Sequence, residues 1–218
     1  MIRSIDDGGL ASYLSHQLNA AYPDGHTVSV DEIRALLPQT LERAEHCFSH
    51  VANKYFFDGR STLFNHLHGD QYAMFLYLAA STAYRLGMAD GLPSKLFLLN
   101  KALHGIDAYF EVELPAIFLF VHPLGTVLGR GQYSDYLLVY QGCGVGSNHD
   151  VYPTLDEHVT LRPGSSVLGR CHVGRNCTLG AGSLLIDADL PSDSVYLGMP
   201  GASKIRPASG PQSIWRVR

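Results

Sequence analysis

The chain has 218 residues, of which 46% are hydrophobic and 17% are charged, and its formal net charge is −4. This length and composition are typical of a soluble globular protein of one or two domains and argue against disorder. The acidic balance excludes the basic surface of a nucleic-acid-binding protein, and the longest apolar runs are too short to span a bilayer. The opening residues, MIRSIDDGGL, lack the apolar core of a signal peptide, so we expect no membrane partner and a cytoplasmic location.

The first half of the chain carries the patterns of α-helices. A capping box begins at Ser29 and precedes apolar residues at helical spacing. Residues 71–87 are apolar on most sides and predict a second, buried helix. Ser94 is expected to cap a third helix, which Gly105 ends. We therefore expect a helical domain over residues 1–108.

Beyond residue 117 the helical period gives way to a period of six. A small residue tends to follow four positions after each aliphatic one, where it would turn a corner without crowding the interior. Three six-residue faces make a coil of about 18 residues, and coils stack at roughly 4.8 Å. The aliphatic positions, with one tyrosine, are Val121, Val127, Tyr133, Val139, Val145, Leu155, Leu161, Val167, Val173, Leu179 and Leu185.

This repeat predicts the fold class and the domain boundaries. We expect an α+β protein in which the helical domain of residues 1–108 is followed by a left-handed parallel β-helix over residues 109–207. Residues 208–218 would form a C-terminal tail. The three cysteines at corner positions, Cys143, Cys171 and Cys177, are interpreted as small apolar fillers rather than as nucleophiles.

One interruption of the period is informative. Ten residues separate Val145 from Leu155, where six would close a face. About four extra residues therefore loop out within residues 147–154, a polar stretch that contains Pro153. Loops on a rigid scaffold often carry function.

Several strings, together with this organisation, resemble bacterial serine O-acetyltransferases and their sugar-acetylating relatives among the hexapeptide-repeat acyltransferases. The resemblance covers about residues 75–207. It implies acetyl-CoA as co-substrate, no metal, and a homotrimer or a hexamer built as a dimer of trimers. The strings that carry it are TAYRL at 82–86, FEVEL at 110–114, HPLGTVLG at 122–129, VYQGCGVG at 139–146 and LGMPGA at 197–202.

The resemblance also implies site residues. His122 matches the catalytic histidine, which would take the acceptor's hydroxyl proton and later protonate the leaving thiolate. Glu113 stands where the family has an aspartate and is the expected partner of that base, with Glu111 and Asp135 as competitors. His149, in the looped-out segment, is a second candidate base. The expected coenzyme contacts are Gly180, Gly182, Gly198 and Lys204.

The acceptor is less defined. Asp70, Asp150 and Tyr152 are the expected acceptor contacts. The family's active-site loop carries Arg-His-Pro where this chain has Val151, Tyr152 and Pro153, so the arginine that would bind a serine carboxylate is missing. The acceptor is therefore either serine or a related small hydroxy compound, or else a sugar hydroxyl of a surface polysaccharide.

Two other classes compete with the acetyltransferase. A γ-type carbonic-anhydrase-like zinc protein would use His122, His149 and His172 as ligands. Once four extra residues are removed, however, the spacing of His122 and His149 is not a whole number of coils. A scaffold subunit that kept the solenoid and lost activity is the other alternative.

Overall fold

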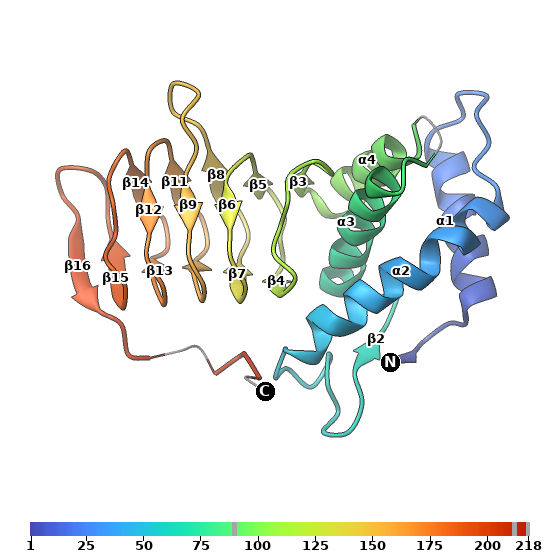
Figure 1. Cartoon of the computed structure of the whole chain (residues 1–218), viewed down its shortest axis with the longest axis horizontal. Helices are drawn as coiled ribbons and strands as arrows, with labels where there is room; N and C mark the ends of the chain where they lie inside the picture. The colour runs from blue at the N-terminus through green and yellow to red at the C-terminus, as the bar shows by residue number, and fades with distance from the viewer. Residues whose placement is uncertain (89–90, 211–212, 217–218) are drawn as a thin grey trace.

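The computed structural model describes residues 1–88, 91–210 and 213–216. A helical half is followed by a column of short strands, which confirms the expected order of the two halves (Figure 1). No helix within the described residues is both long enough and apolar enough to cross a membrane. The helices in this described part are α1 (Asp7–Ala21), α2 (Val30–Ser49), α3 (Gly69–Arg85) and α4 (Leu92–His104).

The helix ends follow from local chemistry. The capping box of α2 is present, since the Ser29 hydroxyl accepts the Glu32 backbone N–H at 3.1 Å and the Glu32 carboxylate accepts the Ser29 N–H at 2.8 Å. The expectation that Ser94 caps α4 is wrong. The helix already begins at Leu92, because proline at its second position suits a first turn that needs no backbone donor. Gly105 ends α4 as expected, with a left-handed φ of 63°.

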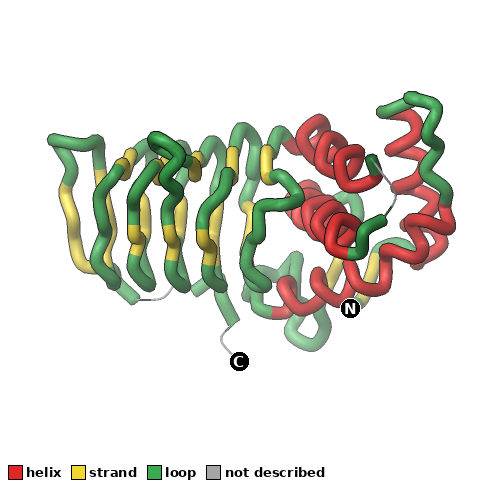
Figure 2. The backbone as a smooth tube through the Cα atoms, turned by 45° about the horizontal axis from the view of Figure 1, so that its top comes forward, coloured by secondary structure: helices red, strands yellow, loops and turns green. Residues whose placement is uncertain are grey.

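Helix α3 forms the centre of the helical half. It packs against α2 and α4 and also against the first strand of the column's long sheet (Figure 2). Every residue from 71 to 83 is buried, which explains why this helix is apolar on most sides. Because α3 touches the solenoid directly, its N-terminal turn can contribute to a site there.

The second half is a parallel β-solenoid with three sheets, as the period of six predicted. In each sheet a strand pairs in parallel with the strand one coil further along. The first sheet has β4 (Phe118–Phe120), β7 (Leu137–Val139), β10 (Thr160–Leu161), β13 (Thr178–Leu179) and β15 (Ser194–Leu197), with antiparallel β16 (Lys204–Pro207) at its edge. The second has β3 (Asp107–Ala108), β5 (Val127–Leu128), β8 (Gly144–Gly146), β11 (Ser166–Leu168) and β14 (Leu184–Ile186). The third has β6 (Gln132–Tyr133), β9 (Thr154–Leu155) and β12 (His172–Val173); β1 (Ile2–Arg3) and β2 (Leu63–Phe64) pair separately.

The solenoid core consists of columns of side chains from successive coils. From Tyr133 onward the residues at the expected inward positions line these columns. The first coil departs from the expectation. Val127 is 50% exposed, and its neighbour Leu128, at 1%, lies in register with Val145. Phe120, rather than Val121, pairs with Val139.

This shift lengthens the first corner. Eight residues separate Phe120 from Leu128, where six separate Val139 from Val145. The turn between β4 and β5 thus has two residues more than the corners stacked on it. Thr126, fully buried, fills the corner where Gly125 was expected, and its hydroxyl donates to the Tyr140 carbonyl at 2.8 Å.

The two halves meet at both ends of the solenoid sequence. Asp107 and Ala108, the last residues of the expected helical domain, already form β3 and pair with β5. At the other end, residues 213–216 lie against the segment that follows α2. Ala52 N–H donates to the Ile214 carbonyl at 2.7 Å, and Trp215, 7% exposed, packs edge-on against Tyr136.

Candidate active site

His122 lies in the lengthened first corner, between β4 and β5. Its backbone is left-handed, with φ of 48°, a conformation that a non-glycine residue adopts at an energetic cost. Its side chain is 80% exposed. A strained backbone that presents an exposed imidazole is typical of a functional position.

Asp70, in the first turn of α3, is the carboxylate beside His122. Its Oδ1 accepts the backbone N–H of His122 at 2.9 Å and lies 3.7 Å from His122 Nδ1. The Asp70 side chain is only 14% exposed. The site thus combines an exposed imidazole from the solenoid with a nearly buried carboxylate from the helical half.

Glu113, the expected partner of His122, lies elsewhere. Its carboxylate is 3.9 Å from the guanidinium of Arg85 and is 83% exposed. Arg85 ends α3 and Asp70 begins it, so about 22 Å of helix separates them at 1.5 Å per residue. Within one chain Glu113 is therefore not brought to His122. Asp135 is also engaged elsewhere, because its carboxylate accepts the Ile117 N–H at 2.9 Å.

The looped-out segment is a tight hairpin with His149 and Asp150 at its tip. Both residues have positive φ, 50° and 59°, which is the geometry of a type I′ turn. Asn148 and Val151 close the hairpin with two backbone hydrogen bonds of 3.1 Å. Tyr152, 39% exposed, follows the turn. The expected loop is therefore present, and its tip is well defined.

Within one chain the hairpin and His122 lie at opposite edges of the second sheet. His122 is in the corner that enters β5 from the first sheet, whereas His149 is in the corner that leaves β8 for the third sheet. The structure brings His122 together with Asp70 but not with His149, Asp150 or Tyr152. These residues can share a site with His122 only across two chains.

The four expected coenzyme contacts gather at the far end of the solenoid. Gly180 and Gly182 form the corner between β13 and β14, and Gly198 follows β15. The Leu184 N–H donates to the Gly198 carbonyl at 3.1 Å, while Lys204 lies opposite Leu197 on β16. A Cβ at Gly180 would come within 2.4 Å of the Leu197 side chain, so only glycine fits this closely packed position without a shift of its neighbours.

A second histidine–carboxylate pair was missed by the sequence interpretation. His172 Nε2, on β12, lies 3.0 Å from Asp156 Oδ2, and both side chains are partly exposed. The only sequence signal is that the two residues belong to neighbouring coils. Their pairing depends on the strand register, which periodicity alone gives only approximately.

The three histidines of the zinc alternative lie apart within one chain. His122 and His149 are at the two edges of the second sheet, and His172 is on the third. Across the described residues, no three side chains of His, Cys, Asp or Glu come close enough together to hold a metal ion.

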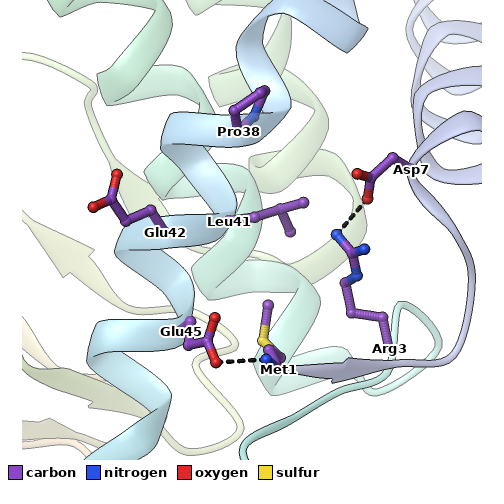
Figure 3. A pocket seen from close by; sticks show the side chains of 7 residues that line it. All are labelled: Met1, Arg3, Asp7, Pro38, Leu41, Glu42 and Glu45. Atoms are coloured by element: carbon purple, nitrogen blue, oxygen red, sulfur yellow. Dashed lines mark hydrogen bonds and ion pairs between the residues drawn. The ribbon is translucent and has the colours of Figure 1, made fainter.

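A cavity of about 450 Å³ in the helical half is lined by residues of the N-terminal segment and of α2, and neither His122 nor Asp70 is among them (Figure 3). Its charged groups are largely paired, since the N-terminal amine contacts Glu45 at 2.5 Å and Arg3 contacts Asp7. No histidine is among the residues that line the cavity. We therefore centre the candidate site on His122 and Asp70.

About half of the chain is similar in sequence to serine acetyltransferases. The serine acetyltransferase of Synechococcus elongatus is 33% identical over 115 residues, which cover 50% of this chain and 47% of that protein. The serine acetyltransferase of Mycobacterium tuberculosis is 26% identical over 125 residues, or 54% of each chain. The chain thus spans about half the length of the curated relatives it matches. No protein-family model matches it.

Solved structures extend the similarity of fold to nearly the whole chain. Serine acetyltransferase from Brucella abortus matches with a TM-score of 0.71 at 18% identity, over 94% of this chain and 85% of that one. A serine acetyltransferase in complex with CoA matches with a TM-score of 0.67 at 18% identity, over 93% and 85% of the two chains. These matches establish the fold as that of serine acetyltransferases, the helical half included.

Proposed function

We propose that this protein is an acetyl-CoA-dependent O-acetyltransferase in which His122 is the general base. One observation carries the proposal: Asp70 holds His122 in a left-handed conformation, in a corner lengthened by two residues, and the resemblance to the family implies that this histidine is the catalytic one. The sequence similarity to serine acetyltransferases supports the class of reaction.

The reaction needs one group that both accepts and donates a proton near neutral pH. His122 would remove the hydroxyl proton of the acceptor as its oxygen attacks the thioester carbon. The C–S bond then breaks, and the imidazolium returns the proton to the CoA thiolate. Imidazole suits both steps because its charge changes in this pH range.

The coenzyme would lie along one edge of the solenoid. The corners of successive coils stack here with glycines of positive φ at Gly125, Gly142, Gly164 and Gly182. His122 is in the first of these corners and Gly182 in the fourth, about 14 Å away at the spacing of parallel strands. An edge with exposed backbone and few side chains suits an extended thioester substrate that must approach the chain closely.

A second copy of the chain would complete the site. Leu124 and Val127, which flank His122, are 69% and 50% exposed, and such apolar side chains favour burial against a partner. An adjoining solenoid would also exclude water from His122 and bring the partner's hairpin to it. We therefore propose a homotrimer, either alone or as half of a hexamer.

The composition of the hairpin bears on whether serine itself is the acceptor. Residues 147–153 contain one acid, Asp150, and no arginine or lysine. A serine carboxylate would find no cation on this loop. Serine and related small hydroxy compounds remain the first acceptors to test, and a sugar hydroxyl is the alternative.

The test is thiol release from acetyl-CoA in the presence of serine, homoserine or nucleotide sugars. H122A should keep the assembly state and lose on the order of 100-fold or more in turnover. H172A is the matched control, because His172 is also a partly exposed histidine beside a carboxylate on the solenoid. It should keep wild-type turnover.

Two results would overturn the assignment. Full turnover in H122A would show that His122 is not the base. Loss of turnover in H172A with an active H122A would move the chemistry to the third sheet.

A further inference from the structure

The contact between His122 and Asp70 joins residues that are 52 positions apart in the sequence. Asp70 is held in place by the first turn of α3. This helix is buried over most of its length. His122 is fixed by the corner that follows β4, a strand that packs on α3. The relative position of the two side chains therefore depends on the packing of the two halves and not on a flexible loop.

The geometry gives the Asp70 carboxylate two tasks. Its Oδ1 already accepts the His122 backbone N–H at 2.9 Å, which secures the left-handed conformation. The same oxygen is 3.7 Å from the ring Nδ1. That separation is longer than a hydrogen bond, but contacts of this kind at catalytic histidines often shorten when substrate binds.

The surroundings favour an immobile carboxylate at this position. The first turn of a helix stabilises negative charge, because the free N–H groups and the helix dipole point toward it. The side chain is 14% exposed, whereas the histidine is 80% exposed. Burial lowers the pKa of His104 below its ordinary value, and the nearby charge of Asp70 partly offsets that lowering.

Two other carboxylates that were expected to compete for this role are engaged elsewhere within the chain. Glu113 is at the far end of α3 beside Arg85, and Asp135 accepts the Ile117 N–H. A histidine that works as a base needs a group that fixes its tautomer and orientation. Asp70 is the group that the structure places at Nδ1.

We propose that Asp70 is the positioning residue of the site: it holds the proton of His122 on Nδ1, directs Nε2 toward the acceptor hydroxyl and stabilises the imidazolium formed during transfer. This inference rests on the proposed function of His122. It differs from the sequence-based expectations, in which Glu113 had this role and Asp70 touched the acceptor.

The variant D70N separates charge from hydrogen bonding. An asparagine oxygen can still accept the His122 N–H, so the corner should keep its conformation while the negative charge is lost. We expect kcat to fall on the order of 100-fold, with the KM values for acetyl-CoA and acceptor within about twofold of wild type. The matched control is D31N, which removes another first-turn carboxylate, from α2, and should leave kcat unchanged.

A double variant tests whether Asp70 acts through His122. H122A/D70N should be no slower than H122A alone, because the positioning residue has nothing left to position. Additive losses would overturn the proposal. A raised acceptor KM with unchanged kcat in D70N would also overturn it and would make Asp70 an acceptor contact.

A measurement that does not depend on turnover distinguishes the proposed role of Asp70 from the proposed role of His122 as the base. Amide hydrogen exchange at His122 should be slow in wild type and in D70N, and fast in D70A, which removes the acceptor of that N–H. Wild-type kcat in D70N, together with an inactive H122A, would refute the role of Asp70 and leave the proposed function standing. An active H122A would refute the proposed function, even if the exchange pattern showed the Asp70 contact.

Discussion

The side-chain amide of Asn148 donates a hydrogen bond of 2.5 Å to the carboxylate of Asp187, two coils further along the solenoid. The other oxygen of that carboxylate accepts the Arg170 backbone N–H at 2.8 Å. Asp187 thus ties the hairpin of residues 148–151 to the corners stacked beyond it. The hairpin is long for a hexapeptide corner but is anchored at its base.

Gly169 lies between these two partners, and a methyl group there should break the contact. An added Cβ would be 2.1 Å from Asp187 Oδ1 and 2.6 Å from Asn148 Cβ, at a φ of 77°. We expect G169A to lower the free energy of unfolding by about 1–3 kcal/mol and to speed amide exchange at Val151. G59A is the control, because Gly59 also has positive φ but no neighbour within 4 Å. Equal effects of both variants would show that backbone strain, and not the clash, matters.

Asp187 should also give the stability a dependence on pH. The Arg170 N–H and the Asn148 amide hold the pKa of Asp187 below its usual value of 3.8. Because the folded-state pKa is lowered, the stabilisation is complete at neutral pH and is lost as the pH falls through the folded-state value. The stability difference between wild type and D187N should be constant near neutrality and shrink below pH 3.8. Chemical denaturation at several pH values would measure it, and a constant difference down to pH 2 would contradict it.

The C-terminal segment of residues 213–216, called here the docked tail, contains a natural fluorescence probe. Trp215 is the single tryptophan of the chain, and it is buried against Tyr136. Arg216 fastens the tail, with a hydrogen bond of 2.8 Å to the Ser49 carbonyl and its guanidinium 3.4 Å from the Phe57 ring centre. We expect R216A to shift tryptophan emission to longer wavelength, because the indole gains water, while far-ultraviolet circular dichroism stays the same. Unchanged emission would show that the tail stays docked without Arg216.

The four cysteines should be inert in the folded protein. All four are free and buried, and burial raises the pKa of each thiol, that of Cys47 to about 12. The thiolate is the reactive form, so a colourimetric thiol reagent at neutral pH should react slowly with the native chain and with four equivalents after unfolding. Rapid reaction of one native thiol would point to a corner that opens.

The solenoid could be predicted because a repeat imposes the same packing requirement many times. Every coil needs an inward aliphatic residue on each face, and Val145, Val167 and Leu185 stack as that requirement demands. The first coil was assigned one residue out of register, since Val121 and Val127 fit the period as well as Phe120 and Leu128 do. Only the strand pairing distinguishes the two alternatives.

The candidate site could be predicted only in part. A local string pointed to His122, and the broken period pointed to the hairpin at residues 148–151. The neighbour of His122 could not be predicted, because the contact with Asp70 depends on how α3 docks on β4. The expectation of Glu113 instead followed the resemblance to the family, whereas in this chain Glu113 lies beside Arg85 at the other end of α3.

The two lengthened corners show that the turns of the solenoid tolerate inserted residues, whereas its stacked strands keep their register. Additional residues are accommodated in the turn from the first sheet into β5 and in the turn from β8 to the third sheet, while the stacked pairs of the second sheet keep their register. Exchanging the segment 147–153 for loops of other lengths should therefore leave the coils intact. Under the proposed function, loop replacement at this position would be the way to change acceptor preference without repacking the core.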